Sequence, residues 1–283
     1  MGAAPGGPWC SCLGSENTAH VFDEFALELT GDFHVYGITR RGYGASSIPD
    51  SAYDANRLGD DVLAVLDALK LMKPVLIGHS LGGEELSSVA SRHPDRVAGL
   101  VYLDAGYQYA FDNGKGTTIE ELQKDTPPRP PGPSAADLAS FMAMRAWYKR
   151  NNGVTFPEAE FHQIAVSSPD GRVGKSSTPP RVPQAIQRGE KKYTDIPVPA
   201  LAIYAIPHDL GPWLRNNEDP AVRTAAEAFA ARETVWAEKQ AKAFEEGVAN
   251  TRVIRLPFAN HYVFLSNEAD VLREMRAFLA TLK

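Results

Sequence analysis

The chain lacks the features that mark several classes of protein. Its 283 residues carry a net charge of −6, and the one basic run of note, residues 188–192, is short and contains a glutamate. That composition predicts no nucleic-acid partner. No apolar run approaches the roughly 18 residues that predict a transmembrane helix. The two cysteines, Cys10 and Cys12, exclude a disulfide framework and make a poor metal site. We therefore expect neither a metal nor a cofactor.

The first residues also lack the marks of a targeting segment. Residues 1–9 hold no basic region and no apolar core, so no signal peptide is visible. As written, the sequence favours a cytoplasmic protein, and secretion stays open if the natural chain begins differently. Nothing in the sequence predicts an oligomeric state.

What the chain does have is an alternation of short β-rich runs with helical patterns, which is typical of a parallel sheet in an α/β protein. Strands are expected at residues 34–38, 74–77, 99–103, 200–204 and 252–256. Apolar spacing predicts helices at 60–71, 81–93, 220–246 and 270–282.

This rhythm breaks between Asp104 and Pro197, where a Pro-rich run lies. We interpret residues 107–195 as a helical, lid-like insertion, and residues 1–106 with 196–283 as the core domain. Helices are expected to begin at Ser134, which forms a capping-box pattern with Asp137, and at Pro157. A separate small domain is the alternative, but the stretch is short for a core of its own.

The strongest motif is Gly78-His79-Ser80-Leu81-Gly82-Gly83, which lies between an expected buried strand and a helix. In that context G-x-S-x-G indicates a nucleophile on a tight strand-to-helix turn. Glycines leave no side chain to clash there, and the serine hydroxyl stands above the sheet. The N–H of Leu81, at the helix start, is predicted to face a developing oxyanion.

With the motifs at 40–47 and 260–262, this pattern resembles the α/β-hydrolase superfamily, and more narrowly bacterial serine esterases and lipases that carry a lid. The resemblance covers residue 13 to the end. It implies a mostly parallel sheet flanked by helices. Family members usually have two further strands before this point, so the first two strands are expected to be missing or shortened.

The resemblance also implies the order serine, acid, histidine. His261 follows the last expected strand and is the predicted base. Asp209, in the loop after residues 200–204, is the favoured acid, although it lies one residue later than the usual spacing. Asp104, at the end of an earlier strand, is the alternative acid. The second oxyanion N–H is assigned to Ser15, where relatives carry His-Gly and this chain does not.

These residues predict a serine hydrolase that cleaves a small or medium apolar carboxylic ester through an acyl-enzyme. Lactonase, amidase and carbon–carbon bond hydrolase activities with the same residues are alternatives. So is a non-catalytic, hydrolase-like binding protein, because the chain lacks the His-Gly pair. Aromatic residues of the insertion are candidate walls of the substrate site, or else simply core of the insertion: Phe141, Trp147 and Phe161.

Overall fold

A six-stranded sheet forms the centre of the molecule in the computed structural model, which describes residues 6–12, 17–118, 121 and 126–282. Its order is β2-β1-β3-β4-β7-β8, and every pairing within it is parallel. The strands are β1 (Gly6–Cys12), β2 (Phe33–Gly37), β3 (Val75–His79), β4 (Gly99–Leu103), β7 (Ala200–Ala205) and β8 (Thr251–Leu256).

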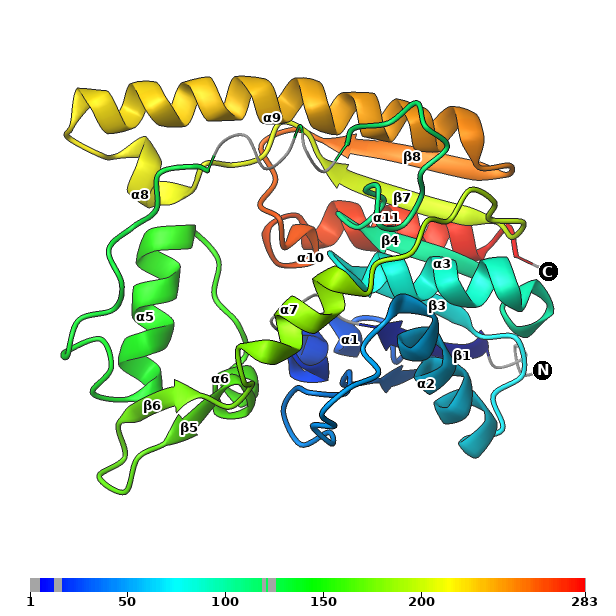
Figure 1. The fold of residues 1–283 in the computed structure, drawn as a ribbon, viewed down its shortest axis with the longest axis horizontal. Helices are drawn as coiled ribbons and strands as arrows, with labels where there is room; N and C mark the ends of the chain where they lie inside the picture. The colour runs from blue at the N-terminus through cyan, green and yellow to red at the C-terminus, as the bar shows by residue number, and fades with distance from the viewer. Residues whose placement is uncertain (1–5, 13–16, 119–120, 122–125, 283) are drawn as a thin grey trace.

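Successive strand residues point to opposite sides of the sheet, so both faces carry apolar side chains. Helices cover both faces. Leu76, Leu100 and Ala202 belong to one apolar core, and their neighbours Ile77 and Val101 belong to the other. The first core is closed by α2 (Ala55–Ala68), α3 (Gly82–Arg92) and α9 (Pro220–Gly247). The second is closed by α1 (Asp23–Leu27), α10 (Val263–Ser266) and α11 (Glu268–Leu279) (Figure 1).

The five strands expected from the sequence are confirmed within a residue or two, as are the helices α3 and α9, and α11 lies two to three residues earlier than expected. Helix α2 begins earlier than expected, at Ala55, because the Asp54 side chain accepts a hydrogen bond from Arg57 N and caps it there. Strand β1 was not expected. Its sequence contains glycine and proline and was not predicted to be a strand, but it pairs with β2 on one side and with β3 on the other.

The insertion holds α5 (Phe141–Asn152), α6 (Glu158–Ile164), a hairpin of β5 (Ala165–Ser167) and β6 (Val173–Ser176), and α7 (Arg181–Arg188). Figure 1 shows α5, α6 and the hairpin at one end of the molecule, beyond the carboxyl ends of the strands.

The expected helix start at Ser134 is wrong, whereas the one at Pro157 is confirmed. Ser134 and Asp137 do exchange the hydrogen bonds of a capping box, with Asp137 N donating to Ser134 Oγ at 3.3 Å. They close only a turn. Helix α5 begins at Phe141, where Ser140 Oγ accepts a hydrogen bond from the Ala143 N–H.

One buried carboxylate fastens the insertion to the core. Glu160 of α6 accepts hydrogen bonds from Thr18 N at 2.9 Å, from Thr18 Oγ1 at 2.6 Å and from Asn17 Nδ2 at 3.0 Å. These bonds join residues more than 140 positions apart. Asn17 and Thr18 directly follow the segment that contains Ser15, so α6 supports the chain beside the expected second oxyanion donor.

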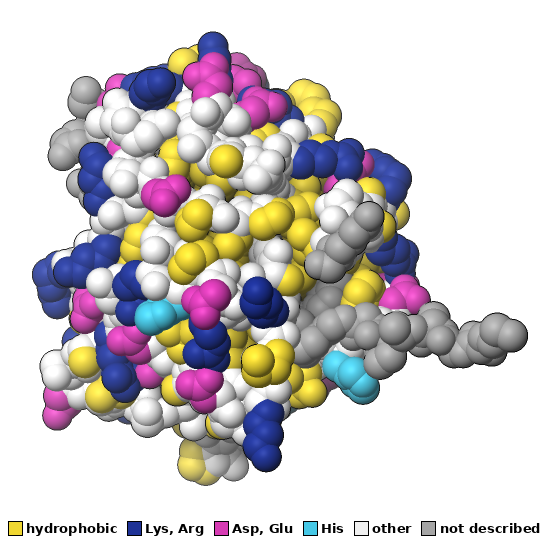
Figure 2. Space-filling model, turned by 90° about the vertical axis from the view of Figure 1, so that its right-hand side faces the viewer, with side chains coloured by type: hydrophobic (Ala, Val, Ile, Leu, Met, Phe, Trp, Pro, Cys, Tyr) yellow, Lys and Arg dark blue, Asp and Glu magenta, His cyan; other side chains and the backbone are white. Residues whose placement is uncertain are grey.

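On the side opposite the insertion, acidic and basic side chains are interspersed around apolar ones (Figure 2). Among the described residues, that face therefore carries no large patch of one charge. Among the helices of the described residues, none combines the length and the apolar character needed to cross a bilayer.

Candidate active site

Ser80 lies on a sharp turn between β3 and α3. Its φ is +50°, a left-handed conformation that is strained for a residue with a side chain and typical of functional sites. The glycines around it are required by space. A Cβ on Gly78 would lie 2.0 Å from Leu86 Cδ1, and one on Gly83 would lie 2.1 Å from the Ala105 carbonyl oxygen. The sequence motif therefore has the local geometry of a nucleophile elbow.

Asp104 and His261 meet at the carboxyl edge of the sheet. Asp104 directly follows β4, and His261 lies in the loop after β8. His261 Nδ1 is 2.6 Å from Asp104 Oδ2. The other oxygen of Asp104 accepts hydrogen bonds from the Tyr107 hydroxyl at 2.8 Å and from Ala205 N at 3.0 Å. This carboxylate is thus held on both sides, with one oxygen turned to His261.

Asp104 is fully buried, and burial alone would raise its pKa. The charges and hydrogen bonds of His208 and His261 outweigh that effect and hold the pKa of Asp104 well below its usual range. Asp104 is therefore an anion at neutral pH.

The favoured acid of the sequence analysis, Asp209, is not brought to His261. Its Oδ1 accepts hydrogen bonds from Arg215 and, at 3.1 Å, from Gly211 N. Helix α8 (Gly211–Arg215) supplies both partners, so the side chain is turned toward the start of that helix. The alternative, Asp104, is the carboxylate that His261 contacts.

His79, inside the elbow motif, contacts the backbone of His261. Burial, followed by the nearby His261, lowers the pKa of His79 to about 3, so its ring is neutral. Its Nε2 lies 3.0 Å from the His261 carbonyl oxygen. Since a carbonyl can only accept, Nε2 carries the proton and donates it. The bond fixes the backbone of the loop that holds His261.

The sequence analysis missed a second histidine, His208, which contacts the same carboxylate. Its Nε2 is 2.7 Å from Asp104 Oδ2, and its Nδ1 is 3.3 Å from Glu233 Oε1 on α9. Burial would lower the pKa of His208, but the Asp104 charge and hydrogen bond, followed by Glu233, raise it to about 10. The position of His208 directly before Asp209, in the loop after β7, was the available signal.

Asp104, His208 and His261 also resemble a metal site in composition, since one atom from each lies within 4.8 Å of the others. However, 2.6 and 2.7 Å are hydrogen-bond lengths. Ligand atoms on a tetrahedral zinc ion, about 2.0 Å from the metal, lie about 3.3 Å apart. The cluster fits shared protons better than a shared ion.

Two tyrosines of the loop after β4 complete the centre, and the sequence analysis missed both. Tyr107 donates to Asp104, as described above. Burial, followed by the Asp104 charge, raises the pKa of Tyr109 well above its usual value, and a hydrogen bond to Ser80 acts in the opposite direction. One short loop thus contacts both the serine and the acid. The signal was the spacing of Asp104, Tyr107 and Tyr109 directly after a strand.

Comparison with known proteins agrees with this geometry. A family model described as "Alpha/beta hydrolase family" matches residues 4–274. The chain belongs to this family. A 2-(acetamidomethylene)succinate hydrolase from Mesorhizobium japonicum is 31% identical over 91 residues, 32% of this chain and 33% of that protein. A bifunctional esterase/perhydrolase from Acinetobacter calcoaceticus is 38% identical over 78 residues, 27% of this chain and 28% of that protein. The chain thus matches about a third of the length of these curated relatives.

Solved structures of hydrolases share the fold over nearly the whole chain. An E-2-(acetamidomethylene)succinate hydrolase has a TM-score of 0.65 at 19% identity, with 99% of this chain and 93% of that chain covered. The esterase RhEst1 from Rhodococcus sp. has a TM-score of 0.64 at 18% identity, with coverages of 98% and 92%. At such identities the likeness establishes the α/β-hydrolase fold.

The structure describes one of the two oxyanion candidates and not the other. Leu81 directly precedes α3, where a backbone N–H has no acceptor within the helix, so it is available to a ligand. Ser15 lies outside the described residues.

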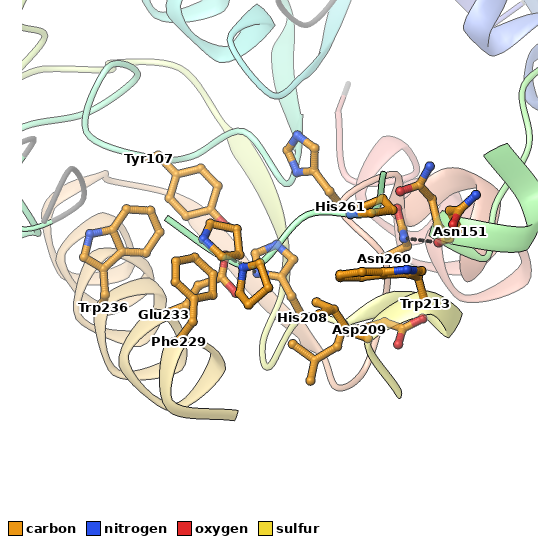
Figure 3. A pocket seen from close by; sticks show the side chains of 16 residues that line it. Tyr107, Asn151, His208, Asp209, Trp213, Phe229, Glu233, Trp236, Asn260 and His261 are labelled. Atoms are coloured by element: carbon orange, nitrogen blue, oxygen red, sulfur yellow. Dashed lines mark hydrogen bonds and ion pairs between the residues drawn. The ribbon is translucent and has the colours of Figure 1, made fainter. Parts of the chain in front are cut away.

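Two cavities meet at His261. The first, about 450 Å³, is walled by aromatic side chains and the Pro-rich run (Figure 3). The second, about 770 Å³, is walled by the insertion. Both are lined by Asn152, Asn260 and His261. Neither has a lysine or arginine among its described lining residues.

The insertion contributes walls, but not the residues expected from the sequence. Phe141 and Phe161 are buried in the apolar core, and Trp147 packs edge-on against Tyr148. None of the three lines either cavity. Tyr148 and Phe156 line the second cavity instead. Phe141 and Phe161 therefore fit the alternative interpretation, as core, whereas Trp147 is half-buried against Tyr148.

Proposed function

We propose that this hydrolase cleaves a neutral, small or medium apolar carboxylic ester through an acyl-enzyme, with Ser80 as nucleophile, His261 as base and Asp104 as acid. The observation that carries the proposal is the 2.6 Å contact between His261 Nδ1 and Asp104 Oδ2, at the sheet edge that also bears the strained Ser80. A serine hydroxyl needs such an adjacent base to react.

The proposed chemistry follows from the hydrogen bonds. Asp104, as an anion, accepts the Nδ1 proton of His261 and so leaves Nε2 free to take the proton of Ser80. Ser80 then attacks the ester carbonyl, and the Leu81 N–H stabilises the oxyanion, with Ser15 as the expected second donor. His261 returns its proton to the departing alcohol. Water, activated by the same base, releases the acid.

The cavities support a neutral substrate. An ester has two parts, one on each side of the scissile bond, and His261 lies where two cavities meet. Recognition of a substrate carboxylate calls for a cation such as arginine, and the described lining residues include none. The succinate group in the name of one relative therefore does not extend to this chain under the proposal.

A fluorophosphonate probe and a pair of serine variants test the proposal. We expect the wild type and Ser167→Ala, which changes an exposed serine of β5, to be labelled, and Ser80→Ala not to be. p-Nitrophenyl esters of acetate, butyrate and octanoate should be hydrolysed. The p-nitrophenyl monoester of succinate, which carries a carboxylate, should be hydrolysed at least about tenfold more slowly than the butyrate.

Three results would count against the proposal. A folded wild type that is not labelled would favour the non-catalytic binding protein. Labelled enzyme without esterase activity would favour lactones, amides or carbon–carbon bonds as substrates, which are assayed in parallel. Preference for the succinate monoester would contradict the neutral substrate.

A further inference from the structure

Asp104 contacts a second histidine, His208, besides His261. Its Oδ2 lies 2.6 Å from His261 Nδ1 and 2.7 Å from His208 Nε2. The second histidine continues to Glu233, 3.3 Å from its other nitrogen. Figure 3 shows His208 between α9, which bears Glu233, and the His261 loop. A chain of charged groups therefore leads from the wall of the first cavity to the triad acid.

The groups around His208 decide its charge. Carboxylates face both ring nitrogens, Asp104 from the end of β4 and Glu233 from α9. The third charged or titratable partner is the ring of His261, whose centroid lies 6.2 Å away. Asp209, the next residue, is paired with Arg215, and Tyr107 and Tyr109 are neutral phenols. With two anions against its two nitrogens, His208 is an imidazolium at neutral pH.

A cation at this place acts on the base through the acid. The Asp104 anion stabilises the protonated form of His261, and a positive charge on the same oxygen offsets part of that effect. Glu233, beyond His208, offsets the cation in turn. Asp104, His208 and Glu233 alternate in sign. Removing the His208 cation therefore favours the protonated form of His261, and removing the Glu233 anion disfavours it.

We propose that His208 and Glu233 are positioning residues that set the pH at which His261 becomes an active base, with His208 acting as a cation shared through Asp104. The inference rests on the proposed function, because it needs Ser80 and His261 to react. Neither residue transfers a proton to the substrate.

The test measures the rate at which a fluorophosphonate labels Ser80 between pH 5 and pH 9. The probe has no titrating group in this range, so the rising limb reports the loss of a proton from the base. His208→Gln keeps a hydrogen-bond donor and removes the cation. Glu233→Gln keeps the shape and removes the anion. His34→Gln and Glu227→Gln, both exposed, are the matched controls.

The two variants should shift the limb in opposite directions. His208→Gln leaves the Asp104 charge acting fully on His261, so the midpoint should rise by about one pH unit. Charges less than 4.8 Å apart could shift it by about 2.5 units at an effective dielectric constant of 20, but the His261 side chain is 41% exposed and solvent screens it. Glu233→Gln should lower the midpoint by about half a unit.

Superimposable profiles for wild type, His208→Gln and Glu233→Gln would overturn the inference, as would shifts of the same sign. A purely structural role would change the plateau and leave the midpoint in place. If circular dichroism shows that His208→Gln does not fold, Glu233→Gln decides alone, because its side chain is 24% exposed and the histidine remains. Absence of labelling in the wild type would instead refute the proposed function.

Discussion

Replacing Asp104 by asparagine should disable the hydrolase, whereas the same change at Asp209 should not. Asp104 Oδ2 accepts from two histidines, while Oδ1 accepts from the Tyr107 hydroxyl and Ala205 N. An amide has one oxygen and one NH₂ group. Either orientation places an NH₂ group against N–H donors, on the histidine side or on the Ala205 side, and the charge that stabilises the His261 imidazolium is lost in both.

We expect kcat/KM for p-nitrophenyl butyrate to fall between about 10³-fold and about 10⁴-fold in Asp104→Asn, which is about 4 to 5 kcal/mol of transition-state stabilisation. The upper figure is the one known for the equivalent change in a serine protease. Asp209→Asn should fall by less than about tenfold, because its partners Arg215 and Gly211 N lie outside the triad. Thermal unfolding checks that both variants fold. The reasoning is refuted if Asp209→Asn suffers the large loss and Asp104→Asn stays within tenfold of the wild type.

Three further variants probe the elbow, the helix behind it and the insertion. Burial raises the pKa of Glu84 to about 8. The contribution of Glu84 to the free energy of unfolding is therefore full below its unfolded pKa of about 4.3 and is lost as the pH rises toward 8. Urea unfolding should show Glu84→Gln gaining about 3 kcal/mol of stability relative to the wild type between pH 5 and pH 8, and a difference that does not change with pH would contradict this. Gly83→Ala should cost at least about 1–3 kcal/mol and slow labelling of the serine, because its Cβ would collide with the Ala105 carbonyl, whereas Gly132→Ala, in open space, should change neither. Phe161→Ala should cost about 3–5 kcal/mol and leave KM for the acetate ester unchanged; a higher KM at full stability would make Phe161 a cavity wall after all.

The nucleophile turn could be predicted because all of its determinants are local. A buried strand, close-packed glycines and a helix start fit into a few consecutive residues, and each constraint can be read from the letters 75–83. The acid could not be chosen in this way. Strands β4 and β7 are neighbours in the sheet, so both Asp104 and Asp209 end up at the same edge. Only the direction of each side chain separates them, and that depends on the partners from α8 and from the loop after β4.

His208 escaped prediction for a related reason. In the sequence it is a histidine before a short helix, and nothing nearby in the chain requires a charged ring. Its partners, Asp104 and Glu233, lie 104 and 25 positions away. The walls of the cavities were missed because aromatic residues on one helix point both inward and outward. Tyr148 lines a cavity, whereas Phe141 is core.

The hydrogen bonds from Asn17 and Thr18 to Glu160 bear on how this protein could be re-engineered. Exchanging insertions between hydrolases is a direct way to alter substrate range, because the insertion supplies most of the second cavity. Here the exchange would also remove the carboxylate that holds Asn17 and Thr18, next to the expected second oxyanion donor. A graft should therefore retain a glutamate at the position of Glu160, so that selectivity is changed without loosening Asn17 and Thr18.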